Sequence, residues 1–155
     1  MARLVLLMRH GEAEGMAVDD AQRALTAAGE AQAAASARYL TGYAIERVVA
    51  SPYRRAQQTA ALVSQELGGG FSSSELLIPD ADPVIALQSL AESTTDNLLL
   101  VCHMPLVSRM AGWLLEGEGA WGPGFATADI AVIEAEWIAA GTGLLRAMLG
   151  PQGRL

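Results

Sequence analysis

The strongest constraint on the fold is a set of short apolar runs that alternate with helix-like stretches. Runs at 3–8, 46–50 and 98–102 have the length of buried strands. Alanine-rich or mixed stretches at 26–39 and 52–67 have the composition and spacing of helices. Strands that alternate with helices predict an α/β fold, a three-layer sandwich with a mostly parallel central sheet and helices on both faces.

Capping residues set the expected ends of the helices. Thr26 is expected to cap the first helix, and Ser51 the second, with Pro52 at a helical position where its missing N–H needs no partner. The remaining expected elements are helices at 83–93 and 105–115 and strands at 75–78, 128–136 and 144–149. A glycine-containing turn joins the last two strands, which predicts an antiparallel C-terminal edge to the sheet.

Length and composition predict one domain over residues 1–155, with 52% hydrophobic residues available for its core. No apolar run approaches the roughly 18 to 20 residues of a membrane span, and the early run is too short for a signal peptide. The one cysteine cannot form an internal disulfide. A net charge of -7 disfavours nucleic acid. We therefore expect a cytoplasmic monomer that binds neither nucleic acid nor membrane.

The candidate site lies where the strands end. The chain has two histidines, His10 and His103, and each directly follows an expected buried strand. In such sheets ligands bind beyond the carboxyl ends of the strands, where Arg9 and Arg55 are also expected. A neutral imidazole can attack phosphorus, and arginine forks suit the oxygens of a phosphoryl group. These residues therefore indicate phosphoryl chemistry.

The arginines near the candidate site differ in the direction in which they are expected to point and in the role they are expected to have. Arg54 and Arg55 would point about 100° apart on a helix. We therefore expect Arg55 to face the pocket and Arg54 to lie at its rim. Arg23, in the loop after the first strand, is either a surface charge paired with Asp19 or Asp20 or a phosphate-binding residue, and both alternatives remain open.

A cysteine-based phosphatase is the rival chemistry, because such enzymes cradle a thiolate in a loop of backbone N–H groups that ends in arginine. Arg109 does lie seven positions after Cys102, but Pro105 removes an N–H group from that loop. We therefore expect Cys102 to be a buried strand residue. Two histidines without a carboxylate cluster do not predict a metal site, and a chain without lysine cannot contain a P-loop. No cofactor is expected.

Five groups of residues carry a resemblance to a known family. In chain order they are Arg9-His10-Gly11-Glu12-Ala13; Arg23 with Leu25-Thr26 and Gly29; Ser51-Pro52 with Arg55-Ala56 and Gln58-Thr59; His103-Met104-Pro105-Leu106-Val107; and Phe125-Ala126-Thr127. With these motifs the chain resembles the histidine phosphatase superfamily, which has the phosphoglycerate-mutase-like fold, and most closely its small SixA-type phosphohistidine phosphatases. The resemblance runs nearly end to end, which makes it far more specific than Arg-His-Gly alone.

The resemblance implies a role for each candidate residue. His10 would accept the phosphoryl group and form a phosphoenzyme. Arg9, Arg55 and His103 would complete the phosphate pocket, with Arg23 as a further phosphate-binding candidate. Members of this family need no metal, which agrees with the residue types present.

The resemblance also bears on the substrate. The segment at 78–83 leaves little room for the lid that larger relatives place over small substrates. Those relatives also carry a glutamate in this region that donates a proton to the leaving group, and here only Asp80 and Asp82 are nearby. Glu12 is a further open candidate for the proton donor. Imidazole leaves more readily than an alkoxide, so a missing acid is tolerable for phosphohistidine. We expect the partner to be a phosphorylated histidine-containing signalling or phosphotransfer protein. The alternatives are a phosphatase or mutase of small phosphate esters and a non-catalytic phosphate-binding module.

Overall fold

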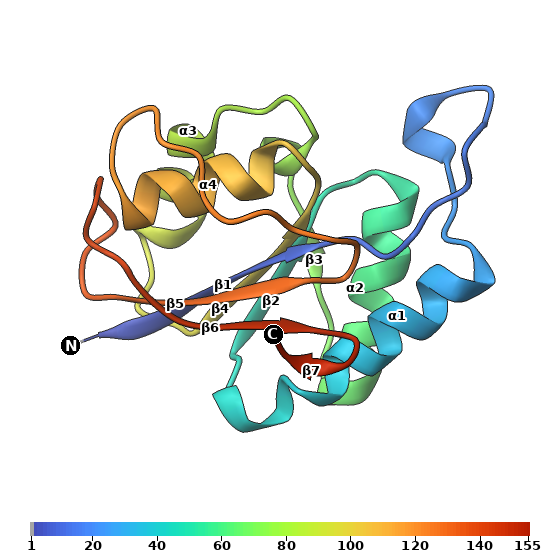
Figure 1. Ribbon diagram of the computed structural model, residues 1–155, viewed down its shortest axis with the longest axis horizontal. Helices are drawn as coiled ribbons and strands as arrows, with labels where there is room; N and C mark the ends of the chain where they lie inside the picture. The colour runs from blue at the N-terminus through green and yellow to red at the C-terminus, as the bar shows by residue number, and fades with distance from the viewer. Residues whose placement is uncertain (1) are drawn as a thin grey trace.

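A seven-stranded mixed sheet organises the protein, and the computed structural model describes residues 2–155 (Figure 1). The strands are β1 (Arg3–Arg9), β2 (Arg47–Ala50), β3 (Ser72–Ser73), β4 (Leu98–Cys102), β5 (Ile130–Ala135), β6 (Leu144–Gly150) and β7 (Gly153–Arg154). The α-helices are α1 (Ala27–Arg38), α2 (Arg54–Leu67), α3 (Pro83–Ala91) and α4 (Leu106–Leu115), and short 3-10 turns are η1 (Asp20–Gln22), η2 (Thr41–Tyr43) and η3 (Glu75–Leu77). No helix in the described part of the chain is long and apolar enough to cross a membrane.

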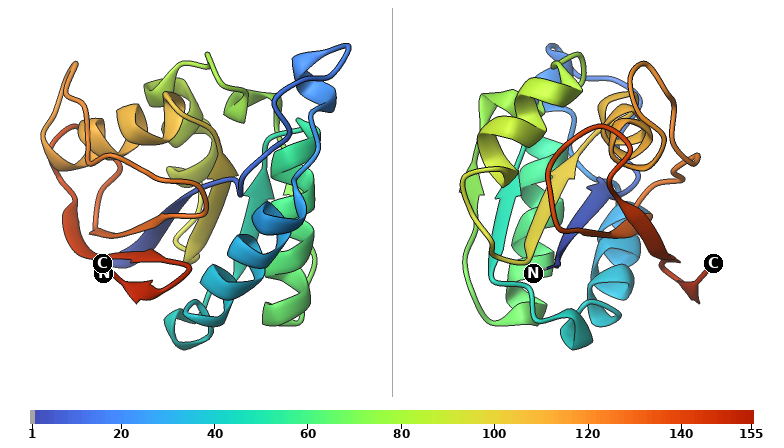
Figure 2. Two further views of the ribbon diagram at one scale, coloured as in Figure 1. Left: turned by 45° about the vertical axis from the view of Figure 1, so that its right-hand side comes forward. Right: turned by 90° about the vertical axis from the view of Figure 1, so that its left-hand side faces the viewer.

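The sheet order is β3-β2-β4-β1-β5-β6-β7. Neighbours from β3 to β1 are parallel, and those from β1 to β7 are antiparallel. Helices α1 and α2 cover one face and α3 and α4 the other, each with its own apolar core (Figure 2). Every residue of β4 is buried, as expected for a strand covered on both faces. The α/β sandwich and its antiparallel edge are thus confirmed.

Three parallel strands end side by side at one edge of the sheet. Arg9 at the end of β1 pairs with Cys102 at the end of β4, and Ala50 at the end of β2 pairs with Val101 of β4. The backbone N–H of His10 donates to the Cys102 carbonyl at 3.0 Å. Register therefore brings the residues that follow β1, β2 and β4 together, although they are up to about ninety positions apart in the sequence.

The expected start of the second helix is wrong. α2 begins at Arg54, and its N-cap residue, Tyr53, makes no side-chain capping hydrogen bond. The reason is that Ser51 still belongs to the sheet edge, because its N–H donates to the Val101 carbonyl. Its buried hydroxyl accepts the Tyr53 N–H at 3.2 Å, so it organises the turn that precedes the helix. The expected Thr26 cap of α1 is confirmed.

The expected strand at 75–78 is also wrong. That segment forms the turn η3, capped by the Ser74 side chain, and the strand of this region is the two-residue β3, which pairs with β2. Leu77 is fully buried within η3. The apolar residues of this segment pack a turn against the core. A short buried strand has the same short run of apolar residues, so the sequence does not distinguish the two.

Candidate active site

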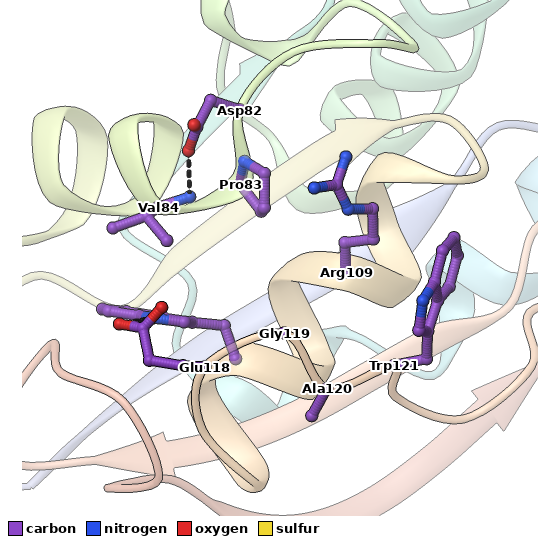
Figure 3. Close-up of a pocket in the computed structure, with 9 residues that line it drawn as sticks. Asp82, Pro83, Val84, Arg109, Glu118, Gly119, Ala120 and Trp121 are labelled. Carbon is purple, nitrogen blue, oxygen red and sulfur yellow. Dashed lines mark hydrogen bonds between the residues drawn. The ribbon is translucent and has the colours of Figure 1, made fainter.

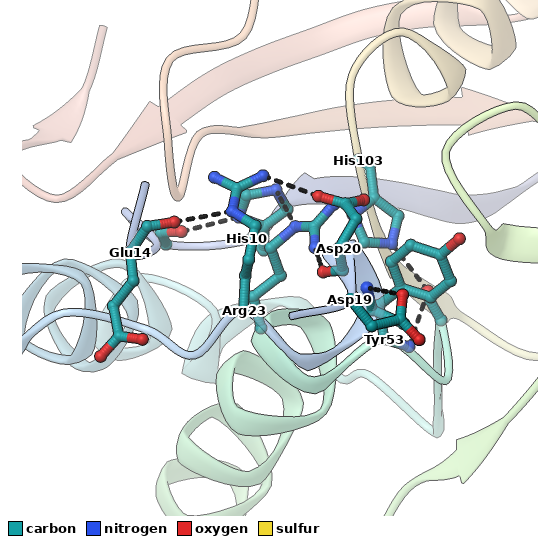
Figure 4. A network of polar contacts seen from close by, with 11 residues as sticks. His10, Glu14, Asp19, Asp20, Arg23, Tyr53 and His103 are labelled. Atoms are coloured by element: carbon teal, nitrogen blue, oxygen red, sulfur yellow. Dashed lines mark hydrogen bonds and ion pairs between the residues drawn. The ribbon is translucent and has the colours of Figure 1, made fainter. Parts of the chain in front are cut away.

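The two imidazoles meet at the edge where the strands end. The ring centroids of His10 and His103 lie 5.2 Å apart, with the ring planes tilted by 60°. The two residues are only 7% and 1% exposed. Figure 4 shows both rings among polar side chains from the loop after β1 and the turn before α2. The structure therefore brings together the two histidines that the strand ends predicted.

The hydrogen bond of His10 defines its tautomer. Its Nδ1 lies 2.7 Å from the carbonyl oxygen of Gly11. A carbonyl only accepts, so Nδ1 carries the hydrogen and donates it. Burial, together with nearby cations such as Arg55, lowers the pKa of His10 to about 4, although the Gly11 bond opposes this shift. At neutral pH the ring is therefore uncharged and Nε2 holds a lone pair, which accepts a hydrogen bond from the Nε–H of Arg55 at 3.3 Å.

His103 is held by the turn before α2. Its Nε2 lies 2.7 Å from the hydroxyl oxygen of Ser51, and the edge of Tyr53 contacts its ring with the centroids 5.1 Å apart. Its Nδ1 is buried and has no partner among the described residues. Burial, then repulsion from the protonated form of His10 and from Arg55, lower its pKa to about 2. His103 is therefore also neutral at physiological pH.

These depressed pKa values predict a loss of stability in mild acid. A histidine in the unfolded chain titrates near pH 6.5, so below that pH the unfolded chain binds protons at these two rings while the folded chain does not. Stability is full above pH 6.5 and falls as the pH drops toward 4. Between pH 7.5 and 5 we expect the free energy of unfolding to fall by about 2 kcal/mol for each imidazole.

Urea unfolding at the two pH values measures this loss. The double variant His10→Asn, His103→Asn is the control, because it removes both imidazoles and should flatten most of the pH dependence. If the free energy of unfolding fell equally with pH in the wild type and in the double variant, the loss of stability would come from carboxylates instead.

The predicted arginines approach the histidines from two elements. Arg9, at the end of β1, donates from one terminal nitrogen to the Phe125 carbonyl at 2.8 Å, and its Nε is buried with no partner among the described residues. Burial lowers its pKa, and Asp129 partly offsets this. Arg55 is 4% exposed and Arg54 is exposed. The expected inward and outward orientations of this pair are confirmed.

The exposed carboxylate of Asp20 bridges Arg23 and Arg55. It accepts from Arg23 at 2.9 Å and from Arg55 at 3.2 Å, and its backbone carbonyl accepts a further bond from Arg55 at 2.7 Å. The hydrogen bond from Arg23 does most to lower the pKa of Asp20; burial opposes it, and the hydrogen bond and charge of Arg55 add to the lowering. Arg23 is thus paired with Asp20 and linked through this carboxylate to Arg55, while its phosphate-binding role stays a prediction.

Asp20 is a site residue that the sequence predicted only as a partner of Arg23. Its contact with Arg55 spans 35 positions and depends on how the loop after β1 folds over α2. The spacing of three residues to Arg23 was the only signal in the sequence. Together the two contacts hold the far end of the Arg55 guanidinium, while its Nε edge faces His10.

The other candidate acids have structural contacts. The carboxylate of Asp82 caps α3 by accepting two backbone N–H groups. Glu12 holds its loop through the backbone, donating to Gln32 and accepting from Thr26, and its side chain is exposed. Asp80 is exposed as well. None of these three carboxylates forms a hydrogen bond or ion pair to either imidazole in the described residues.

The cysteine-based alternative is excluded by the surroundings of Cys102. This residue is fully buried in β4, and burial raises the pKa of its thiol to about 12. Arg109 does not approach it; the arginine lines a separate pocket of about 410 Å³ between the start of α3, α4 and the loop at 118–121 (Figure 3). Within residues 2–155, no group of three histidine, cysteine or acidic side chains is placed to hold a metal ion.

Known proteins share both the sequence and the fold. The sequence profile of the histidine phosphatase superfamily (branch 1) matches residues 5–78. Phosphohistidine phosphatase SixA of Escherichia coli (strain K12) is 34% identical over 138 residues, which are 83% of each chain. The SixA homolog of Haemophilus influenzae is 36% identical over 124 residues, 71% of this chain and 76% of the relative.

The solved structure of the protein histidine phosphatase SixA complexed with tungstate superimposes with a TM-score of 0.84 and 31% identity, covering 96% of this chain and 97% of that one. The expected family is thereby confirmed along most of the chain, including the segments that follow β1, β2 and β4. This protein belongs to the histidine phosphatase superfamily and is a phosphatase.

Proposed function

We propose that this phosphatase removes the phosphoryl group from a phosphorylated histidine on a signalling or phosphotransfer protein, through a phosphoenzyme formed on His10. The observation that carries the proposal is the unprotonated Nε2 of His10, in a neutral ring next to His103. Its lone pair accepts a hydrogen bond from the Nε–H of Arg55, which an incoming phosphoryl group would replace. The names of the two curated relatives support the substrate class.

In the first step, the Nε2 lone pair of His10 attacks phosphorus. The bond from phosphorus to the substrate imidazole breaks, its electron pair stays on the leaving nitrogen, and that nitrogen takes a proton from solvent. In the second step, water attacks the phosphorus on His10, the new N–P bond breaks, and inorganic phosphate departs. The water proton goes to phosphate or solvent, and the neutral ring is restored.

The arginines and His103 stabilise the charge that spreads over the phosphoryl oxygens. Three groups can donate hydrogen bonds to these oxygens: the buried Nε–H of Arg9, the Nε edge of Arg55 and Nδ1 of His103. Within residues 2–155 no group pairs with the Nε–H of Arg9 or with Nδ1 of His103, and both are buried, so a bound anion that contacted them would satisfy their hydrogen-bonding capacity.

The carboxylates near the site support a nitrogen leaving group. Asp20, the carboxylate in contact with Arg55, is kept ionised by two arginines and is therefore a poor proton donor. Asp82 is occupied at the start of α3. An ester would need an acid to protonate its alkoxide, whereas imidazole leaves without strong assistance.

A substrate panel tests the proposal. We expect kcat/KM for a phosphohistidine-bearing phosphotransfer protein to exceed that for sugar phosphates and phosphoserine peptides by at least about 100-fold, the usual worth of a general acid. A preference for the esters would overturn the proposed substrate and indicate a phosphatase or mutase of small phosphate esters. Binding of phosphate without any turnover would overturn it in favour of a phosphate-binding module.

A further inference from the structure

The hydroxyl of Ser51 makes two contacts in a place without solvent. Ser51 is 0% exposed and His103 is 1% exposed. The hydroxyl oxygen lies 3.2 Å from the Tyr53 nitrogen, whose N–H it accepts, and 2.7 Å from Nε2 of His103. Because water does not reach this group, each hydrogen in the cluster has to be assigned to one of these atoms.

One assignment leaves a single polar atom of this cluster unpaired, Nδ1 of His103, whereas the other leaves two. The Ser51 hydroxyl has a single hydrogen to donate, and Nε2 of His103 is its only acceptor in the described structure. If Nε2 carried the hydrogen instead, the buried hydroxyl hydrogen would lack an acceptor, at a cost of about 1 to 3 kcal/mol by general experience with such groups. Nε2 therefore accepts, and in a neutral ring the hydrogen must then lie on Nδ1.

We infer that Ser51 is a positioning residue that holds His103 in the Nδ1–H tautomer, so that this neutral ring presents an N–H group to a phosphoryl oxygen. Nδ1 is the remaining polar atom of the ring and is buried without a partner in the part of the chain that the structure describes. With the opposite tautomer it would present a lone pair, which repels a phosphoryl oxygen. The part of this inference that concerns phosphate rests on the proposed function; the tautomer itself does not.

The same tautomer serves opposite purposes in the two rings. In His10 the Gly11 carbonyl occupies Nδ1–H, so Nε2 stays unprotonated; its lone pair accepts from Arg55 and is the one that attacks phosphorus. In His103 the Ser51 hydroxyl occupies the Nε2 lone pair and leaves Nδ1–H free to donate. One ring is thus prepared as a nucleophile and the other as a hydrogen-bond donor, without a net charge on either.

Long-range ¹H–¹⁵N correlation spectra of protein labelled with ¹⁵N-histidine test the tautomer directly. With two histidines in the chain the spectrum contains two ring systems, and His10→Asn assigns them. At pH 7.5 we expect His103 to show a protonated Nδ1 and an unprotonated Nε2. A protonated Nε2 in the wild type would overturn the inference, whatever the enzyme's substrate.

The variant Ser51→Ala should remove the preference of His103 for the Nδ1–H tautomer. We expect the Nε2–H form of His103, which free histidine prefers, to become populated, while the His10 signals stay unchanged and show that the site has folded. Ser108→Ala is the matched control: it removes another buried hydroxyl, which donates to the Gly122 and Pro123 carbonyls, without touching His103. An unchanged His103 spectrum in Ser51→Ala would contradict the inference.

Binding of inorganic vanadate separates the two proposals. We expect Ser51→Ala to raise its dissociation constant about tenfold, the usual worth of one hydrogen bond to a charged group, and Ser108→Ala to leave it unchanged. Unchanged affinity in Ser51→Ala would overturn the phosphate-directed part of the inference. Absence of both vanadate binding and turnover in the wild type would instead overturn the proposed function, while the tautomer would still be decided by the spectra.

Discussion

Changing His10 to asparagine is expected to lower kcat for phosphohistidine by about 1,000-fold or more, because the other imidazole of the site, His103, has its Nε2 lone pair occupied by the Ser51 hydroxyl and cannot take over the attack. Asparagine has a similar shape but lacks the Nε2 lone pair that faces Arg55. The arginines remain in the variant, so substrate affinity should change far less than turnover.

Trapping the phosphoenzyme gives the clearest measurement. Wild-type protein mixed with radiolabelled phosphohistidine substrate and quenched in alkali should carry an acid-labile label on His10, and His10→Asn should carry none. His103→Asn is the control, since it keeps the nucleophile: it should still become labelled, but more slowly. Label on His103, or label retained by His10→Asn, would overturn the assignment.

Changing Arg55 to lysine is expected to lower kcat/KM by about 100-fold to 1,000-fold, the range seen when one preorganised donor to a transition state is lost. Lysine keeps the charge, but it cannot reach His10 and the two oxygens of Asp20 at the same time, as the planar guanidinium does. The expected loss is therefore one of geometry rather than of charge.

The neighbouring arginine provides the matched control. Arg54→Lys is the same substitution one position earlier in α2, at an exposed side chain, and should leave kcat/KM within about twofold. Both variants should keep the far-ultraviolet circular dichroism spectrum of the wild type. Equal kinetic losses in the two variants, or a larger loss in Arg54→Lys, would contradict the placement of Arg55 beside the nucleophile.

The fold was largely predictable because buried parallel strands are continuous apolar runs, and β1, β2 and β4 all have this signature. The predictions that were wrong are those in which a local sequence signal conflicted with contacts made in the tertiary structure. Ser51 and Pro52 satisfy the usual sequence signal for a helix start, yet the chain extends the sheet edge there and α2 begins at Arg54. The apolar residues of η3 fill a core position without forming a strand.

The sequence alone determined which side chains gather at one edge of the sheet. Parallel strands end on the same side, so residues directly after β1, β2 and β4 lie at one edge of the sheet, and the observed order β2-β4-β1 places them next to one another. Only the tertiary structure decided which atom each side chain presents: the Gly11 carbonyl, the Ser51 hydroxyl and the Asp20 carboxylate select the free edges of His10, His103 and Arg55. Hydrogen bonds depend on distances of a few tenths of an ångström and on direction, and those are set by how loops and helices pack, which no periodicity in a sequence records.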